Sequence, residues 1–158
     1  MKKLIFQVSV GKPSKLYQTC IDSVARYCEK YGITHKVLYE PKLKIVPDPN
    51  RNGRSKEAIS RLGYMPIYEK ENAFEYFGEY DQVAIVDSDI YIKPNAPDIF
   101  LDLPQQYDFG GVLERDLPLN KKYQNKIRKY SQSAFTNLKD VDWKWNTLGA
   151  EFYNMGLM

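Results

Sequence analysis

The chain has 158 residues and a formal net charge of +3, and hydrophobic residues make up 43% of it. This length and composition are those of one globular domain with its own core, which excludes a disordered or fibrous chain. The charge is too small to indicate a nucleic-acid-binding protein, although it suits an anionic small molecule. We therefore expect a single domain over residues 1–158, with no nucleic-acid partner.

The first forty residues predict a strand, a helix and a second strand. Leu4 to Val10 alternates and then runs apolar, as a buried strand does. Leu16 to Tyr31 has apolar residues at helical spacing, with Ser14 as a plausible N-cap and Gly32 as a natural end. Thr34 to Glu40 has the pattern of the next strand. This order predicts two parallel strands joined by a right-handed crossover.

Both helix and strand patterns recur along the rest of the chain. The expected helices are Lys56 to Leu62, Pro66 to Phe77, Asp98 to Leu103 and Asn120 to Phe135. The expected strands are Gln82 to Val86, Ile90 to Ile92, Phe109 to Glu114 and Glu151 to Met158. The polar segment Pro41 to Arg54 has the composition of a loop. Together with the parallel crossover at the start of the chain, these elements predict an α/β fold with a mostly parallel central sheet flanked by helices.

Two cysteines, Cys20 and Cys28, lie on the first expected helix. Eight residues of helix separate their backbones by about 12 Å. A disulfide needs Cα atoms within about 7 Å, so these two thiols do not pair with each other there. Free thiols indicate a reducing compartment, and we expect a cytoplasmic protein. No segment has the length and apolar character of a membrane span.

Asp87 and Asp89 stand directly after the expected buried strand Gln82 to Val86. In open α/β sheets, ligands bind beyond the carboxyl ends of the strands. Side chains alternate along a strand, so both carboxylates reach one metal only if the chain bends at Ser88. Mg²⁺ and Mn²⁺ are often held by one or two carboxylates together with substrate phosphates. The pair therefore predicts a metal–diphosphate site; in the alternative, Asp87 caps a turn and Asp89 is a solvated loop residue.

The run from Tyr80 to Ile92 resembles the GT-A glycosyltransferases, especially the glycogenin-like and bacterial galactosyltransferase family. That family has a Tyr-Asp pair, a hydrophobic strand, Asp-x-Asp and a hydrophobic tail. Lys70 is similar to the family's basic residue that reaches the sugar nucleotide. Phe152 to Met158 resembles its Phe-Asn-x-Gly strand, with Tyr153 as one extra residue. The resemblance implies a GT-A type, Rossmann-like nucleotide-binding domain.

The resemblance also implies a function. The chain would move a sugar from a nucleoside-diphosphate sugar, most simply a UDP-sugar, to an unknown glycan or other acceptor, with Mn²⁺ or Mg²⁺ as cofactor. The metal ligands would be Asp87 and Asp89. The residues expected to bind the nucleotide or sugar are Val8, Ser9, Val10, Tyr17, Lys70, Asp87 and Ser88. Asn154 and Glu114 are expected at the reacting sugar as catalytic residues.

The chain departs from the family in one respect. The family's third metal ligand is a histidine well after the Asn strand, and this chain ends before it. The single histidine, His35, is expected to be a surface or edge residue. The apolar end of the chain, without a polar cap, predicts a fragment of a longer protein. The alternative function is therefore a nucleotide-sugar-binding module without turnover.

Two other enzyme classes fit less well, and a basic segment stays open. An aspartyl-phosphate phosphatase has Asp-x-Asp after its first strand and a Thr where Tyr91 stands here. A nucleotidyltransferase needs a Gly-rich loop containing Arg after strand one, which Gly11 to Ser14 is not. The basic residues are Lys121, Lys122, Lys126, Arg128 and Lys129. They have the pattern of a solvated helix face, the alternative being a patch for a phosphorylated acceptor, an anionic glycan or a membrane surface. The sequence leaves the oligomeric state open.

Overall fold

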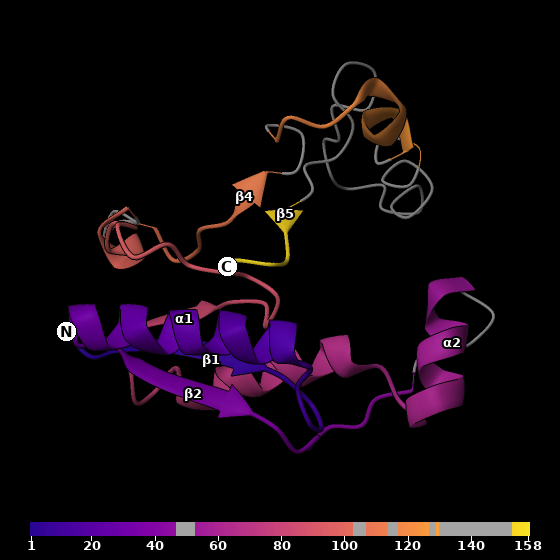
Figure 1. Ribbon diagram of the computed structural model, residues 1–158, viewed down its shortest axis with the longest axis horizontal. Helices are drawn as coiled ribbons and strands as arrows, with labels where there is room; N and C mark the ends of the chain where they lie inside the picture. The colour runs from indigo at the N-terminus through magenta and orange to yellow at the C-terminus, as the bar shows by residue number, and fades with distance from the viewer. Residues whose placement is uncertain (47–52, 103–106, 114–116, 127–128, 130–152) are drawn as a thin grey trace. The chain divides into compact units, whose positions relative to one another are not determined.

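The computed structural model describes residues 1–46, 53–102, 107–113, 117–126, 129 and 153–158. The chain divides into two compact units, Met1–Asp108 and Phe109–Met158 (Figure 1). Each unit contains a sheet of its own: three strands in the order β2-β1-β3 in the first, and the pair β4-β5 in the second. The sequence leads us to expect one domain over residues 1–158, whereas the structure divides the chain into these two units.

The first unit is built on a parallel sheet. β1 (Lys3–Val8) lies between β2 (Thr34–Leu38) and β3 (Gln82–Ile85), and both neighbours run parallel to it. Successive residues of β1 from Leu4 to Gln7 are almost completely buried, so both faces of this strand are covered. A strand covered on both faces has a continuous run of buried residues, as the sequence predicts for this segment. The expected α/β fold, with a parallel sheet flanked by helices, is confirmed.

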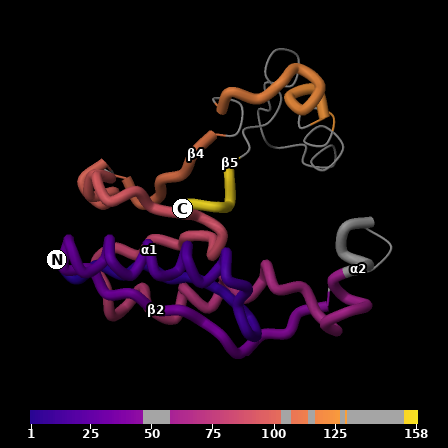
Figure 2. The backbone as a smooth tube through the Cα atoms, in the orientation of Figure 1, coloured from indigo at the N-terminus to yellow at the C-terminus, as the bar shows by residue number. Residues whose placement is uncertain are grey.

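α1 (Lys15–Tyr31) connects β1 to β2, and Figure 2 shows the backbone passing from the helix into that strand. The Ser14 side chain accepts a hydrogen bond from the Tyr17 N–H, which confirms the expected N-cap. Gly32 ends the helix with a left-handed φ of 63°, which glycine adopts at little cost. Leu16 was expected in the apolar stripe but is 67% exposed, because the buried stripe begins one turn later.

The buried face of α1 is a single stripe at helical spacing. It consists of Cys20, Ile21, Ser23, Val24, Tyr27 and Cys28. Both cysteines are free and buried, which confirms that they do not pair with each other. Burial raises the pKa of the Cys28 thiol to about 12, so this thiol stays protonated and unreactive.

η1 (Pro66–Tyr76) covers the expected helix Pro66 to Phe77 but is a 3₁₀ helix. The spacing of apolar residues does not distinguish a 3₁₀ helix, with three residues per turn, from an α-helix, with 3.6. The sequence therefore located the helix but did not predict its type. η1 contacts β1 and β3. The rings of Phe6 and Tyr76 lie 5.8 Å apart, which places η1 on the face of the sheet that carries Phe6. α2 (Gly53–Leu62) precedes η1 and confirms the expected short helix.

The chain after β3 corrects one expected strand. Ile90 to Ile92 was expected to resume β structure, but no strand forms there. Instead, the Ile92 N–H donates a hydrogen bond to Ser23 Oγ of α1 at 2.9 Å. The alternating apolar residues are therefore fixed against a helix and not by strand pairing. A short 3₁₀ helix, η2 (Ile99–Leu101), lies within the expected helix Asp98 to Leu103, whose last residue is outside the described part of the chain.

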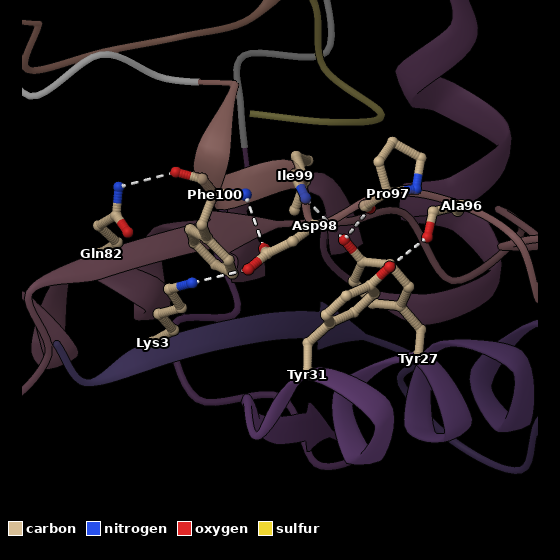
Figure 3. A network of polar contacts seen from close by, with 9 residues as sticks. All are labelled: Lys3, Tyr27, Tyr31, Gln82, Ala96, Pro97, Asp98, Ile99 and Phe100. Carbon is tan, nitrogen blue, oxygen red and sulfur yellow. Dashed lines mark hydrogen bonds and ion pairs between the residues drawn. The ribbon is translucent and has the colours of Figure 1, made fainter.

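Hydrogen bonds hold the segment before η2 onto α1 and the start of β1 (Figure 3). The Tyr27 hydroxyl donates to the carbonyl of Pro97 and accepts from the N–H of Ile99, each at 2.7 Å. Asp98 forms an ion pair with Lys3 at 2.8 Å, and both side chains are largely buried. This network ties the segment to the amino end of the sheet, away from the ends of the strands where ligands bind in open α/β folds.

In the second unit, β4 (Val112–Leu113) and β5 (Tyr153–Asn154) form a short antiparallel pair. They lie within the expected strands Phe109 to Glu114 and Glu151 to Met158. Residues 121–126 and 129 are helical, within the expected basic helix. In the part of the chain that the structure describes, no helix has the length and apolarity needed to cross a bilayer.

Candidate functional site

The carboxyl ends of β1 and β3 lie side by side. The Val86 N–H donates to the carbonyl of Phe6 at 3.0 Å, which carries the parallel pairing one residue beyond β3. The end of β1 with the two residues after it, Val8–Val10, and residues 87–89 after β3 therefore reach the same edge of the sheet. Ser9 is buried, and its N–H donates to the carbonyl of Leu38 at 2.9 Å. The structure thus brings together the two segments that the sequence assigned to the nucleotide and the metal.

Asp87 and Asp89 are carried on a tight turn. Ser88 and Asp89 are its central residues, and the Ile90 N–H donates to the carbonyl of Asp87 at 3.1 Å to close it. The expected bend of the chain at Ser88 is therefore confirmed. Asp87 and Ser88 are half-buried and Asp89 is exposed. Both carboxylates are accessible at the edge of the sheet.

Lys70 forms an ion pair with Asp87 Oδ1. The lysine side chain is only 10% exposed, whereas that of Asp87 is 36% exposed. Ile85 lies opposite Phe6 in the parallel register, and Asp87 follows two residues later, so strand alternation directs its side chain to the η1 face. Lys70 lies on that helix. The sequence placed Lys70 near the site, and the structure adds that its ammonium group contacts the motif's first carboxylate.

Gln7 and His35 also lie at the site, where the sequence did not predict them. Gln7 is completely buried, and its Nε2 donates to the carbonyl of Asp87 at 3.2 Å. Its Oε1 lies 2.8 Å from His35 Nε2. Burial lowers the pKa of His35, which favours the neutral ring. His35 lies on the edge strand β2, as expected, but it is hydrogen-bonded inward. The polar Gln7 within an otherwise apolar strand was the one sequence signal for this contact.

The acidic side chains fit a metal that shares its coordination with a phosphate ligand. Among the described residues, no group of three or more His, Cys, Asp or Glu side chains is arranged to hold an ion. Asp87 and Asp89 supply carboxylate oxygens, which Mg²⁺ and Mn²⁺ prefer. Such ions take several of their ligands from substrate phosphates and water. The donor set therefore fits a metal–diphosphate complex better than a metal held by the protein alone.

Tyr17 lies in the first turn of α1, which begins just after the carboxyl end of β1. Its side chain is 41% exposed, so it is not packed in the core. An exposed aromatic ring near this edge is consistent with the expected stacking on a base. The stacking itself stays a prediction.

The expected catalytic residues belong to the second unit. Asn154 lies in β5, and its Oδ1 accepts a hydrogen bond from the N–H of Gly156 at 2.9 Å. Within that unit it lines a hollow of about 330 Å³ together with Asn120 and Tyr123. Glu114 lies outside the described residues. The catalytic role of both residues stays a prediction.

The basic segment is described only in part. Lys121, Lys122, Lys126 and Lys129 are exposed, as a solvated helix face requires, and Arg128 lies outside the described residues. Exposure agrees equally with a surface for an anionic partner, so neither alternative is excluded.

The comparisons with known proteins find similarity at the level of structure. No protein-family model matches the chain, and no curated protein matches it. One solved structure that resembles it is described as the "crystal structure of a glycosyltransferase involved in the glycosylation of the major capsid of PBCV-1". The two chains share 16% sequence identity, the match covers 88% of this chain and 68% of that one, and the TM-score is 0.46. Similarity at this level does not assign a function to the chain.

Proposed function

We propose that the chain is a metal-dependent glycosyltransferase that takes a sugar from a nucleoside-diphosphate sugar, most simply a UDP-sugar. The observation that carries the proposal is the turn holding Asp87 and Asp89 at the carboxyl end of a parallel strand, with Lys70 paired to Asp87. A pair of carboxylates beside a largely buried cation, at the edge where α/β sheets bind ligands, suits a metal–diphosphate group.

Each side chain has a distinct part in this proposal. Asp89 is exposed and would hold Mn²⁺ or Mg²⁺ directly. Asp87 is paired through Oδ1, so its Oδ2 would turn to the same ion while Lys70 fixes the carboxylate. When bound, the metal supplies Lewis acidity that offsets negative charge on the departing nucleoside diphosphate. The positive charge of Lys70 adds to that effect next to the phosphates.

The nucleoside would lie along the end of β1. Val8 and Val10 are half-buried there and offer apolar surface, while Ser9 is held by its main-chain bond to β2. Tyr17 is exposed in the first turn of the following helix and offers a ring for the base. These residues would orient the nucleotide so that its diphosphate reaches the turn of residues 87–90.

The test is calorimetric titration of the chain with uridine diphosphate, with and without Mn²⁺. We expect binding that strengthens at least about tenfold with the metal, and loss of that gain in Asp89→Ala. Asp81→Ala is the matched control, because Asp81 is an exposed acid that bonds the N–H of Lys2 at the amino end of the sheet. The proposal would be wrong if the affinity for uridine diphosphate were the same with and without Mn²⁺, or if Asp89→Ala kept the full gain from the metal.

Turnover is measured separately as release of uridine diphosphate from a panel of UDP-sugars, with and without glycan acceptors. Release that needs the metal supports the transferase. Metal-dependent binding without release from any donor would instead assign the chain as a nucleotide-sugar-binding module.

A further inference from the structure

We infer that Gln7 is a positioning residue for the metal site: its side chain, oriented by His35, holds the main-chain carbonyl of Asp87 and so fixes the turn that carries both carboxylates. The inference rests on the proposed function, because it concerns the geometry of the same Asp87–Asp89 pair. Nothing in the metal-binding chemistry itself requires a glutamine near the carboxyl end of the central strand.

Gln7 is an unusual residue for its place. It is completely buried, in the central strand of the sheet, directly after the buried Phe6. A buried amide is costly unless both of its ends are hydrogen-bonded. Both ends are bonded here, at 3.2 Å to the carbonyl of Asp87 and at 2.8 Å to His35. An apolar side chain would fill this place without needing partners, so the distinctive effect of the amide is the contact with the turn.

The carbonyl of Asp87 is where the turn is held. It accepts a hydrogen bond from the Ile90 N–H at 3.1 Å, which closes the turn, and a second from Gln7 Nε2. A carbonyl oxygen has two lone pairs, and both are used. The second bond ties the turn to β1, which is the central strand. A metal site needs its ligands held to within fractions of an ångström, so a fixed turn favours binding of one ion by Asp87 and Asp89.

The carbonyl of Asp87 decides which end of the Gln7 amide faces the turn, and the bond to His35 holds the side chain in that orientation. The two ends of an amide have nearly the same shape, but the carbonyl of Asp87 can only accept a hydrogen bond. The donating Nε2 must therefore face it, and Oε1 must face His35. This orientation requires the Nε2-protonated ring of His35, which donates to Gln7 Oε1 across the 2.8 Å contact. A flipped amide would set two acceptors against each other at Asp87.

The first measurement does not depend on any ligand. Hydrogen exchange of the Ile90 amide, followed by NMR, reports the closure of the turn. In Gln7→Leu and Gln7→Glu, we expect this amide to exchange about three- to tenfold faster than in the wild type, the factor that loss of one ordinary hydrogen bond produces. Gln7→Glu keeps the shape and the acceptor for His35 but loses the donor. His35→Phe keeps the donor and should give a smaller change in the same direction.

Lys3→Met is the matched control. It removes a largely buried polar contact, the pair with Asp98, from the other end of the same strand. It should lower stability without changing exchange at Ile90. Unchanged exchange in both Gln7 variants, or an equal acceleration in Lys3→Met, would overturn the inference.

The second measurement links the turn to the metal. In both Gln7 variants, the affinity for uridine diphosphate in the presence of Mn²⁺ should fall about tenfold, while the affinity without metal stays near that of the wild type. In Lys3→Met, both affinities should stay near those of the wild type. Wild-type affinity in the Gln7 variants would refute the positioning role. A wild type that shows no metal-dependent binding would instead defeat the proposed function, and exchange at Ile90 would still decide whether Gln7 fixes the turn.

Discussion

At the scale of single residues, the ion pair of Lys70 and Asp87 differs in kind from the surface pairs of the chain. The lysine side chain is 10% exposed, so its charge is largely removed from water. Removing one partner of such a pair leaves the other without compensation. By contrast, Lys42 and Glu75 form a pair whose side chains are about half exposed, at 47% and 55%. Exposed pairs of this kind contribute little to stability.

Lys70→Met should therefore lower the free energy of unfolding by about 1–2 kcal/mol, less than for a fully buried pair because Asp87 is partly exposed. Mn²⁺ should raise the melting temperature of this variant more than that of the wild type, since the ion replaces the missing charge beside Asp87. Thermal denaturation with and without Mn²⁺ measures both effects. Lys42→Met is the control, with no measurable loss of stability expected because both side chains of its pair are exposed. Equal losses in the two variants would contradict this account.

At the scale of elements, Glu69 connects η1 to the segment that leaves β2. Its carboxylate is completely buried and accepts hydrogen bonds from the N–H groups of Lys42, Leu43 and Lys44 at 2.8–3.1 Å. Asn72 Nδ2 adds a fourth donor at 2.9 Å. Consecutive N–H groups that converge on an anion form a nest. Residues 41–46 belong to an expected loop, and this side chain binds three of them through their main-chain N–H groups, while the Met65 N–H donates to the carbonyl of Ile45 at 3.0 Å.

Glu69 should make stability depend on pH. Burial alone raises the pKa of Glu69, but the N–H groups of Lys44, Lys42 and Leu43 and the Asn72 amide outweigh it and lower that pKa below its ordinary 4.5. As pH falls, Glu69 therefore takes up a proton in the unfolded chain before it does so in the folded chain. The stability that its carboxylate contributes is complete above pH 4.5 and is lost as pH falls below 4.5 through the lowered pKa of the folded state. Glu69→Gln should cost about 1.5–3 kcal/mol at pH 7 and remove this part of the acid dependence.

Urea denaturation between pH 3 and pH 7 measures this difference. Glu75→Gln is the matched control, because Glu75 is exposed on the same helix and should leave the profile unchanged. If the free energy of unfolding of Glu69→Gln fell with decreasing pH as steeply as that of the wild type, the Glu69 carboxylate would not be the cause of the acid dependence.

At the scale of the whole molecule, the core belongs to the first unit. Among the described residues, every buried apolar side chain lies between Leu4 and Phe100, within Met1–Asp108. The network around Asp98 also closes within this unit, since it joins α1, β1 and the segment that precedes η2. A unit with its own sheet and core satisfies the requirements for folding alone.

Residues 1–108 expressed alone should therefore unfold in one cooperative transition and bind uridine diphosphate with Mn²⁺ within about threefold of the full chain, since the residues proposed to bind both lie in this unit. The fragment should release no product, because Asn154 and Glu114 are absent from it. Circular dichroism melts and calorimetry measure folding and binding. A fragment without a cooperative transition, or with affinity reduced more than about tenfold, would show that binding needs the second unit.

The sequence by itself determined the elements whose signals are local. Periodicity and caps located β1, α1 and β2, and Asp87 and Asp89 were placed after a buried strand, because strand alternation, N-caps and left-handed glycines act within a few residues. Only the tertiary structure decided that Lys70 pairs with Asp87 and that Gln7 holds its carbonyl. The second contact joins residues 80 positions apart, and it exists only because β1 and β3 pair in parallel in one register. Sequence patterns carry no record of that register, so they placed Asp87 and Asp89 at a strand end but could not predict the contacts that fix their turn.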